Sequence, residues 1–186
     1  MSRLDAVLAA IDAANAADPD RSEGEPAARL YGLRMSDELS RLYPGAGEVL
    51  RIAARGQHIE RWVLARAGYP DGRTGYLTWR RDLARHHANR VGEIMRAHDY
   101  DEDAINATGR MLRKEGIKRD PDVQALEDTA CFVFLRHYFA PFSTTQTPDK
   151  LRTIVERTAR KMSEQARARV LAEFDLPEDL SAGFRA

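Results

Sequence analysis

Apolar residues recur every three or four positions along almost the whole chain, whereas no segment shows the every-second-residue alternation of a β-strand. This spacing places side chains on one face of an α-helix, and that face must be buried against other helices. The ranges expected to be helical are 3–17, 31–42, 47–65, 76–97, 101–115, 121–139, 148–161 and 165–174. The pattern therefore predicts an all-α fold, a bundle of about seven or eight helices.

Turn-forming residues separate these helices without marking a second domain. Asp18-Pro19 and Pro44-Gly45 end the first two helices, and Asp120-Pro121 begins the sixth. Gly68–Gly75 is the strongest interruption of the helical pattern and is expected to be a defined loop. A chain of 186 residues can form one hydrophobic core. We expect a single domain spanning residues 1–186.

The balance of charge argues against partners that are recognised by a long-range field. Lys and Arg together number 29, as do Asp and Glu, so no net charge draws the molecule to nucleic acid or to an anionic membrane. Residues 1–17 lack the basic start and apolar centre of a secretory signal, and no stretch approaches the roughly twenty apolar residues that span a bilayer. The sequence predicts a cytoplasmic protein with no membrane partner.

Two histidines are expected to point into the core. His87 shares its helical stripe with Leu83 and Val91, whereas His86 falls on the face of Arg90. His58 lies on the edge formed by Leu50, Ala54 and Trp62. A buried neutral imidazole is a good ligand for a divalent metal, and it is equally compatible with a core histidine that makes one backbone or water contact.

Glu127 and Asp128 directly precede the apolar run 129–135, so at least one of these carboxylates is expected to be buried. An unpaired buried carboxylate costs several kcal/mol, and it therefore needs a cation, a metal or strong hydrogen-bond donors. Two interpretations stand: a metal site, or a salt bridge with Arg34 or Arg61.

The segment from Arg73 to Arg81 mixes aromatic rings with guanidinium groups, a combination that suits a phosphate or a nucleotide. In the alternative interpretation Tyr76 and Trp79 pack under the loop while the arginines are solvated. Use of this segment to bind RNA finds no support in the overall charge. A second basic cluster near Gly116 is interpreted as a helix end that complements its dipole; it contains Arg113, Lys114, Lys118 and Arg119.

Four sequence stretches together resemble an uncharacterised family, domain of unknown function 4202. They are Gln57-His58-Ile59-Glu60-Arg61-Trp62, Tyr69-Pro70-Asp71-Gly72-Arg73, Gly75-Tyr76-Leu77 and Leu126-Glu127-Asp128. The resemblance extends over nearly the whole chain and implies no particular activity.

More distantly, the order of elements is similar to the HD superfamily of metal-dependent phosphohydrolases. Tyr31 occupies the place of that superfamily's first histidine, and Gln57 and His58 stand where its His-Asp pair would be. His87 would correspond to an additional histidine of some members, and Glu127 or Asp128 to the closing aspartate. The resemblance implies an HD-like bundle with a much altered metal site.

Together these observations lead to a functional hypothesis and an alternative. The hypothesis is a metal-dependent phosphohydrolase acting on a nucleotide or another small phosphorylated compound. Its expected metal ligands are His58, His87 and Asp128, holding Mn, Fe, Zn, Ni or Mg; its proton-transfer residues are Glu60 and Glu127; its substrate-binding residues are Arg34, Gln57, Arg61, Arg73 and Arg80. The alternative is a non-catalytic ligand-binding or regulatory protein that has lost the metal site.

Overall fold

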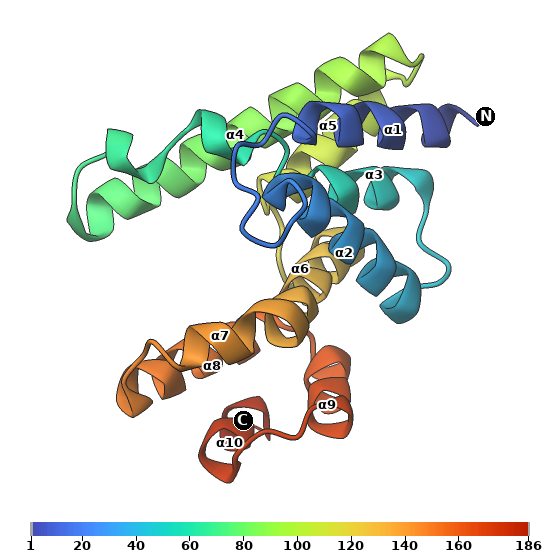
Figure 1. The fold of residues 1–186 in the computed structure, drawn as a ribbon. Coiled ribbons are helices and arrows are strands. Elements are labelled where there is room, and N and C mark those ends of the chain that lie inside the picture. Colours follow the sequence, from blue (N-terminus) through green and yellow to red (C-terminus); the bar gives the residue numbers. More distant parts are fainter. Residues whose placement is uncertain (1, 186) are drawn as a thin grey trace. The chain divides into compact units, whose positions relative to one another are not determined.

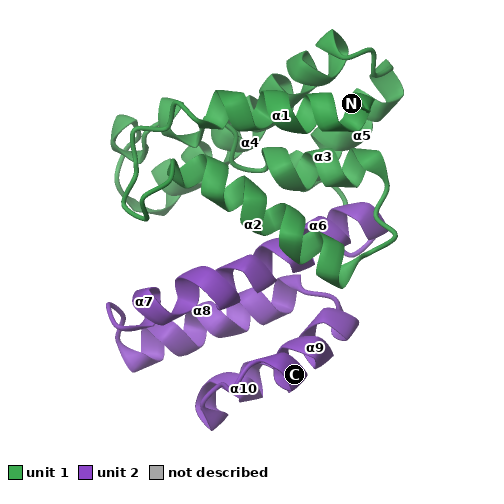
Figure 2. Cartoon of the chain, turned by 45° about the vertical axis from the view of Figure 1, so that its right-hand side comes forward, with its two compact units in different colours: residues 1–116 green, residues 117–186 purple. Residues whose placement is uncertain are grey.

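The computed structural model describes residues 2–185, and every regular element among them is helical. The prediction of an all-α fold is confirmed. The described residues form ten α-helices rather than seven or eight, together with short 3₁₀ and π-helical segments (Figure 1). The chain divides into two compact units, Met1–Gly116 and Ile117–Ala186 (Figure 2), and each is described by itself.

Unit 1 contains the helices that carry most of the predicted site. They are α1 (Arg3–Asn15), α2 (Ala27–Leu42), α3 (Glu48–Gly56), α4 (Gly72–Ala97) and α5 (Glu102–Leu112), with the 3₁₀ turns η1 (Arg61–Val63) and η2 (Arg66–Gly68) between α3 and α4. Helix α3 packs against α1, α2, α4 and α5, and α4 lies along α5 as the two arms of a helical hairpin (Figure 1). Fully buried side chains from four of these helices form the core: Ile11, Met35, Ile52, Val91 and Met95.

The third helix is shorter than the expected range 47–65. Helix α3 ends at Gly56, and His58 lies in the turn that follows rather than on a helix. Glu60 adopts a left-handed conformation, φ 48°, and its backbone N–H donates to Oδ1 of the buried Asn15 over 2.9 Å. A left-handed residue cannot continue a right-handed helix, so this contact with α1 holds the chain in the turn. Periodicity could not show it, because the two residues are far apart in sequence.

Helix α4 begins four residues before its expected start at Tyr76, directly from the turn-rich loop. Gly72 has φ +83°, a conformation that glycine adopts readily. A Cβ added to Gly75 would lie 1.9 Å from the carbonyl oxygen of Pro70, so only glycine lets the loop approach the first turn of α4 this closely. The 26 residues of α4 extend for about 39 Å, which makes it the longest element of the described chain.

Unit 2 is built from α6 (Pro121–Val133), α7 (Phe139–Ser143), α8 (Pro148–Lys161), α9 (Glu164–Glu173) and α10 (Glu178–Arg185). The expected helix 121–139 is continuous apart from a π-helical segment, η3 (Phe134–Tyr138), between α6 and α7. The Asp120 side chain accepts hydrogen bonds from the N–H groups of Asp122 and Val123, and Pro121 occupies the first turn, as the sequence predicts. Helix α10 packs against α8 and α9, and α8 also contacts α6.

Candidate anion-binding site on helix α4

A groove lined mainly by cations lies on unit 1, where α4 runs beside the chain that follows α5. Its volume is about 340 Å³, and its lining consists of Arg80, Arg81, Ala84, Arg85, Arg113, Lys114 and Glu115. We call it the basic groove. Five of these seven side chains are positively charged, and Glu115 is the only acid among them. The groove is therefore electropositive.

The arginines of the basic groove differ in their ion pairs. Arg113 binds both carboxylate oxygens of Glu115, at 2.8 and 3.2 Å, and Arg81 lies 3.3 Å from Asp82. Within residues 2–185, neither Arg80 nor Arg85 has a carboxylate within 4.0 Å. Two guanidinium groups of the groove thus keep their full capacity to bind an anion.

Three histidine rings lie close together in unit 1, and we call them the imidazole cluster. His58 stacks on Tyr31 with ring centroids 3.8 Å apart, and its centroid is 6.0 Å from that of His87. The ring of His86 is 5.8 Å from that of His87, and its Nε2 lies 3.9 Å from Oε2 of Glu60. The structure therefore brings His58 and His87 together, as the sequence analysis expected.

The charges around the imidazole cluster are almost all positive. Burial is the main reason why the pKa of His58 lies well below its ordinary value, and Arg61, His87, Arg80 and Lys114 lower that pKa further. Burial likewise lowers the pKa of His87 to about 3, with His86, Arg61 and Arg80 adding to the effect. Both rings are therefore neutral near pH 7. Arg80 and Lys114, which influence His58, also line the basic groove.

Helix geometry connects the groove with His87. Positions 80, 84 and 87 follow one another at spacings of four and three residues, so Arg80, Ala84 and His87 share a face of α4. Nε2 of His87 is buried and has no hydrogen-bond partner among the described residues, and the same is true of Oε1 of Gln57. Buried polar atoms of folded proteins are rarely left without a partner, so these two atoms are candidates for ligand contacts.

Glu60 and Arg61 adjoin the imidazole cluster. Oε2 of Glu60 accepts a hydrogen bond from Nε of Arg90 over 3.0 Å. The guanidinium carbon of Arg61 lies 4.8 Å from the ring centroid of Trp79, whose Nε1 donates to the carbonyl oxygen of Leu64 over 2.8 Å. Burial lowers the pKa of Arg61, and the nearby Arg80 lowers it further. Two arginines predicted to bind substrate thus face the same electropositive region.

The other two predicted substrate-binding arginines have different surroundings. Arg34 donates to both carboxylate oxygens of Glu23, over 3.0 and 2.6 Å. Arg73 is exposed in the first turn of α4. The structure therefore offers Arg61 and Arg80 as the better-placed members of the predicted set.

Glu127 and Asp128 are both buried in unit 2, so the prediction that at least one of them is buried is confirmed. Asp128 accepts hydrogen bonds from the Gln124 side chain at 2.9 Å and from the backbone N–H and hydroxyl of Ser163 at 2.8 and 2.6 Å. Ser163 caps the N-terminus of α9. Glu127 lies 3.8 Å from Nζ of Lys161. Within unit 2, Asp128 thus connects α6 to the start of α9.

Comparison with known proteins assigns the family. The sequence model of the domain of unknown function DUF4202 matches residues 5–182. The chain belongs to the DUF4202 family. None of the curated proteins and none of the solved structures matches it. The matched region includes every residue of the basic groove and the imidazole cluster, so both are features of the DUF4202 domain in this chain.

The metal centre expected from the sequence needs three or four ligands in a fixed arrangement. No group of three or more His, Cys, Asp or Glu side chains that could hold a metal ion occurs within the described part of this DUF4202 chain. The charged neighbours that act on His58 are cations, which does not suit a divalent cation at that ring. The expectation that Asp128 joins His58 and His87 stays a prediction. In the same range, none of the helices is long and apolar enough to cross a bilayer.

The basic groove was not predicted from the sequence, although Arg80, Arg113 and Lys114 each belong to a predicted basic cluster. The positions of the basic residues relative to the connection between α4 and α5 could have revealed the groove, because these two helices form a hairpin. Arg85 lies twelve residues before the end of α4, and Arg113 lies just past the end of α5, eleven residues beyond its start. Antiparallel helices place positions at equal distances from their connection side by side. The two basic clusters of this DUF4202 chain therefore meet.

Proposed function

We propose that this protein binds a small phosphorylated molecule, with the phosphate held in the basic groove. The observation that carries the proposal is the convergence of five cations on a groove of about 340 Å³, in which Arg80 and Arg85 have no ion pair with any described residue. The volume is at the lower end of the range of about 300 to 1,000 Å³ typical of small-ligand sites. A small anion therefore suits the groove better than a large apolar ligand.

Phosphate is the anion that this arrangement favours. A guanidinium group donates two parallel hydrogen bonds to phosphate, and phosphate oxygens accept several such donors at once. Arg80 and Arg85 on α4 and Arg113 on the facing segment approach from two sides. A doubly charged phosphate would relieve the mutual repulsion of these cations, including the effect of Arg80 on Arg61.

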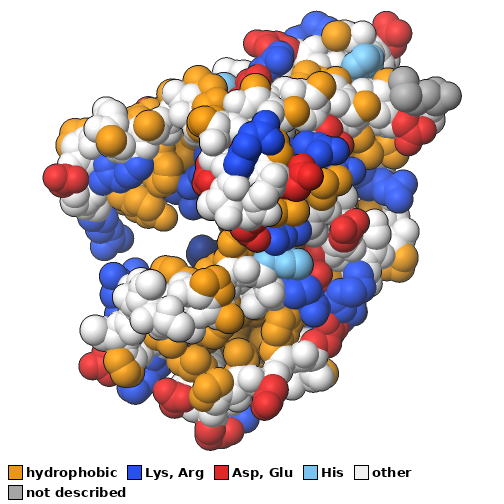
Figure 3. Space-filling model, viewed as in Figure 1, with side chains coloured by type: hydrophobic (Ala, Val, Ile, Leu, Met, Phe, Trp, Pro, Cys, Tyr) orange, Lys and Arg blue, Asp and Glu red, His pale blue; other side chains and the backbone are white. Residues whose placement is uncertain are grey.

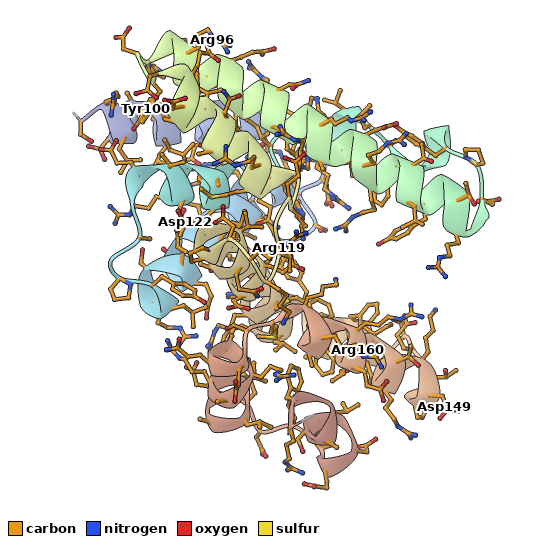
Figure 4. All side chains as sticks on the ribbon, turned by 180° about the vertical axis from the view of Figure 1, so that it is seen from behind. Arg96, Tyr100, Arg119, Asp122, Asp149 and Arg160 are labelled. Carbon is orange, nitrogen blue, oxygen red and sulfur yellow. The ribbon has the colours of Figure 1, made fainter. Side chains whose placement is uncertain are left out.

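A titration of inorganic pyrophosphate into the protein tests the proposal. The double variant Arg80→Gln and Arg85→Gln is expected to bind at least tenfold more weakly, since a hydrogen bond to a charged group contributes about 1.5 to 3 kcal/mol. Arg96→Gln is the matched control, because Arg96 lies on the same helix and is paired with Glu102 through bonds of 2.8 and 3.1 Å. Figure 4 shows Arg96 near Tyr100, at the end of α4 opposite its Gly72 end.

The salt dependence gives a second readout of the same titration. Binding through exposed cations weakens as ionic strength rises, because salt screens charges over about 10 Å at 0.1 M. Absence of binding in the wild-type protein, or equal binding by the double variant and the Arg96 control, contradicts the proposal.

Phosphoester hydrolysis is the second candidate, and the proximity of His58 and His87 at 6.0 Å favours it. The resemblance to HD phosphohydrolases implies this activity, and that resemblance stays a prediction. The cytoplasmic location expected from the sequence also stays a prediction. A neutral imidazole is the form that accepts a proton, and burial keeps both rings in that form. Glu60, next to His86, remains the predicted proton acceptor in unit 1.

Phosphate release from a panel of phosphorylated compounds, with and without added divalent metals, tests the second candidate. The hydrolytic hypothesis expects turnover that a His87→Ala variant loses while it still binds pyrophosphate. Binding without turnover under all of these conditions leaves the non-catalytic function.

A further inference from the structure

An exposed aromatic ring stands one helical turn before the basic groove. Tyr76 precedes Arg80 by four residues and Leu77 precedes Arg81 by four, so both adjoin the lining of the groove along α4. Tyr76 is 45% exposed and Leu77 54% exposed. In Figure 3 hydrophobic and Lys or Arg side chains gather together at the left-hand end of unit 1, where the Gly72 end of α4 lies.

Neighbouring groups hold the ring of Tyr76 in place. Its centroid lies 5.8 Å from that of Trp79, with the two planes inclined at 50°. Trp79 is fixed by its hydrogen bond to the carbonyl oxygen of Leu64 and by Arg61 over its ring. Gly75 allows the loop at Pro70 to pack against this turn of the helix. Tyr76 is therefore the exposed end of an ordered row of flat groups that runs from Arg61 through Trp79.

From this arrangement we infer that the phosphorylated ligand is a nucleotide, with its phosphates in the basic groove and its base stacked on Tyr76. The inference rests on the proposed function and specifies its ligand. One turn of helix separates the aromatic ring from the first arginine of the groove, a rise of about 6 Å, and a sugar joins a base to its phosphates over a comparable length. The lining of the groove is mainly cationic and includes no aromatic ring, so it suits the phosphates, and the base lies outside it on the exposed ring.

Stacking suits an exposed tyrosine better than insertion into a lipid layer does. A base stacked on a tyrosine ring buries one face of the base and one face of the ring, and it needs no further pocket. Such base–aromatic stacking contributes about 1 to 3 kcal/mol for each base. The same free energy corresponds to a gain of roughly fivefold to more than a hundredfold in affinity.

Calorimetric titrations with inorganic pyrophosphate and with adenosine diphosphate test the inference, because both ligands carry the diphosphate and only one carries a base. We expect adenosine diphosphate to bind the wild-type protein at least fivefold more tightly than pyrophosphate. Tyr76→Ala is expected to abolish this difference and leave pyrophosphate binding unchanged. Tyr76→Phe, which keeps the ring, is expected to preserve the difference.

The titrations separate the two proposals. Pyrophosphate binding that depends on Arg80 and Arg85, without any gain from the base, would overturn the nucleotide inference and leave the proposed function standing. Failure of both ligands to bind the wild-type protein would overturn the proposed function itself. Binding to vesicles that contain phosphatidic acid, lost in Tyr76→Ala and Leu77→Ala while adenosine diphosphate shows no gain, would overturn the nucleotide in favour of a lipid surface.

Discussion

The polar groups buried around α4 and the acids buried in α6 differ in how far their bonding capacity is met. Asp128 in α6 accepts a hydrogen bond from Gln124 on the same helix and two from Ser163, and the two from Ser163 hold the start of α9 in place. Nε2 of His87 in α4 has no such partner among the described residues, and Arg80 nearby has no ion pair. A buried carboxylate whose hydrogen bonds are met indicates a structural role. A buried ring nitrogen without a partner, near an exposed arginine without a carboxylate, indicates a ligand site. Burial alone does not distinguish a structural group from a ligand-binding group.

Replacing Asp128 by alanine is expected to produce the largest change in stability. The substitution leaves the N–H and the hydroxyl of Ser163 without their acceptor and removes one of the two acceptors of the Gln124 amide, so the free energy of unfolding should fall by about 3 kcal/mol. Urea denaturation measures the loss. Asp122→Ala, an exposed position in the first turn of the same helix (Figure 4), is the control and should cost at most about 0.5 kcal/mol. Unchanged stability together with lost pyrophosphate binding would reverse the comparison between the two regions.

Acidification is expected to destabilise the imidazole cluster. The folded pKa of His87 is about 3, below its ordinary value of 6.5, so below pH 6.5 the unfolded chain takes up a proton that the folded protein does not. The contribution of the neutral His87 to the free energy of unfolding is therefore fully present above pH 6.5 and is lost progressively as the pH falls toward 3. One histidine contributes about 1.4 kcal/mol for each pH unit, or roughly 2.7 kcal/mol between pH 6.5 and 4.5.

Urea denaturation across this pH range isolates the contribution of His87. His87→Gln should make the dependence on pH shallower by about the amount that one histidine contributes. His98→Gln, at the partly exposed C-cap of α4, is the comparison variant. Identical pH dependence in the wild-type protein and His87→Gln would show that burial and the nearby cations do not hold the ring neutral in the folded protein.

Gly75→Ala is expected to disturb the scaffold of the groove. The new Cβ would meet the carbonyl oxygen of Pro70 at 1.9 Å, and the backbone must move to admit it. Overpacking of this kind costs about 1 to 3 kcal/mol. A thermal melt compares this variant with Gly68→Ala, where no atom lies within 4 Å of the new Cβ. If both variants melt together, the close approach of loop and helix does not support the α4 side chains.

Removal of the one acid that lines the basic groove is expected to strengthen anion binding slightly. Glu115→Gln removes the partner of Arg113 and leaves a third guanidinium free to bind the anion. Pyrophosphate should bind a few times more tightly, because an exposed ion pair is worth about 0.2 to 1 kcal/mol. Weaker binding in this variant would mean that Glu115 positions Arg113 rather than competes with the ligand.

Local pattern was sufficient to predict the fold class but only part of the site. The apolar stripe of α4 predicted His87 correctly as buried, because helical periodicity reports which face is inside. The end of α3 at Gly56 depends on the contact between Glu60 and Asn15 of α1, which no local pattern encodes. The basic groove likewise depends on the pairing of α4 with the segment after α5. Residues joined by tertiary contacts therefore had to be found in the structure.

If the guanidinium groups of Arg80 and Arg85 bind an anion, the NMR signals of their Nε–H groups will respond to it. Addition of pyrophosphate should shift the signals of Arg80 and Arg85, which have no ion pair within residues 2–185, and leave that of Arg96, paired with Glu102, unchanged. Equal shifts of all three signals, or no shift of any, would show that Arg80 and Arg85 do not form the anion-binding site.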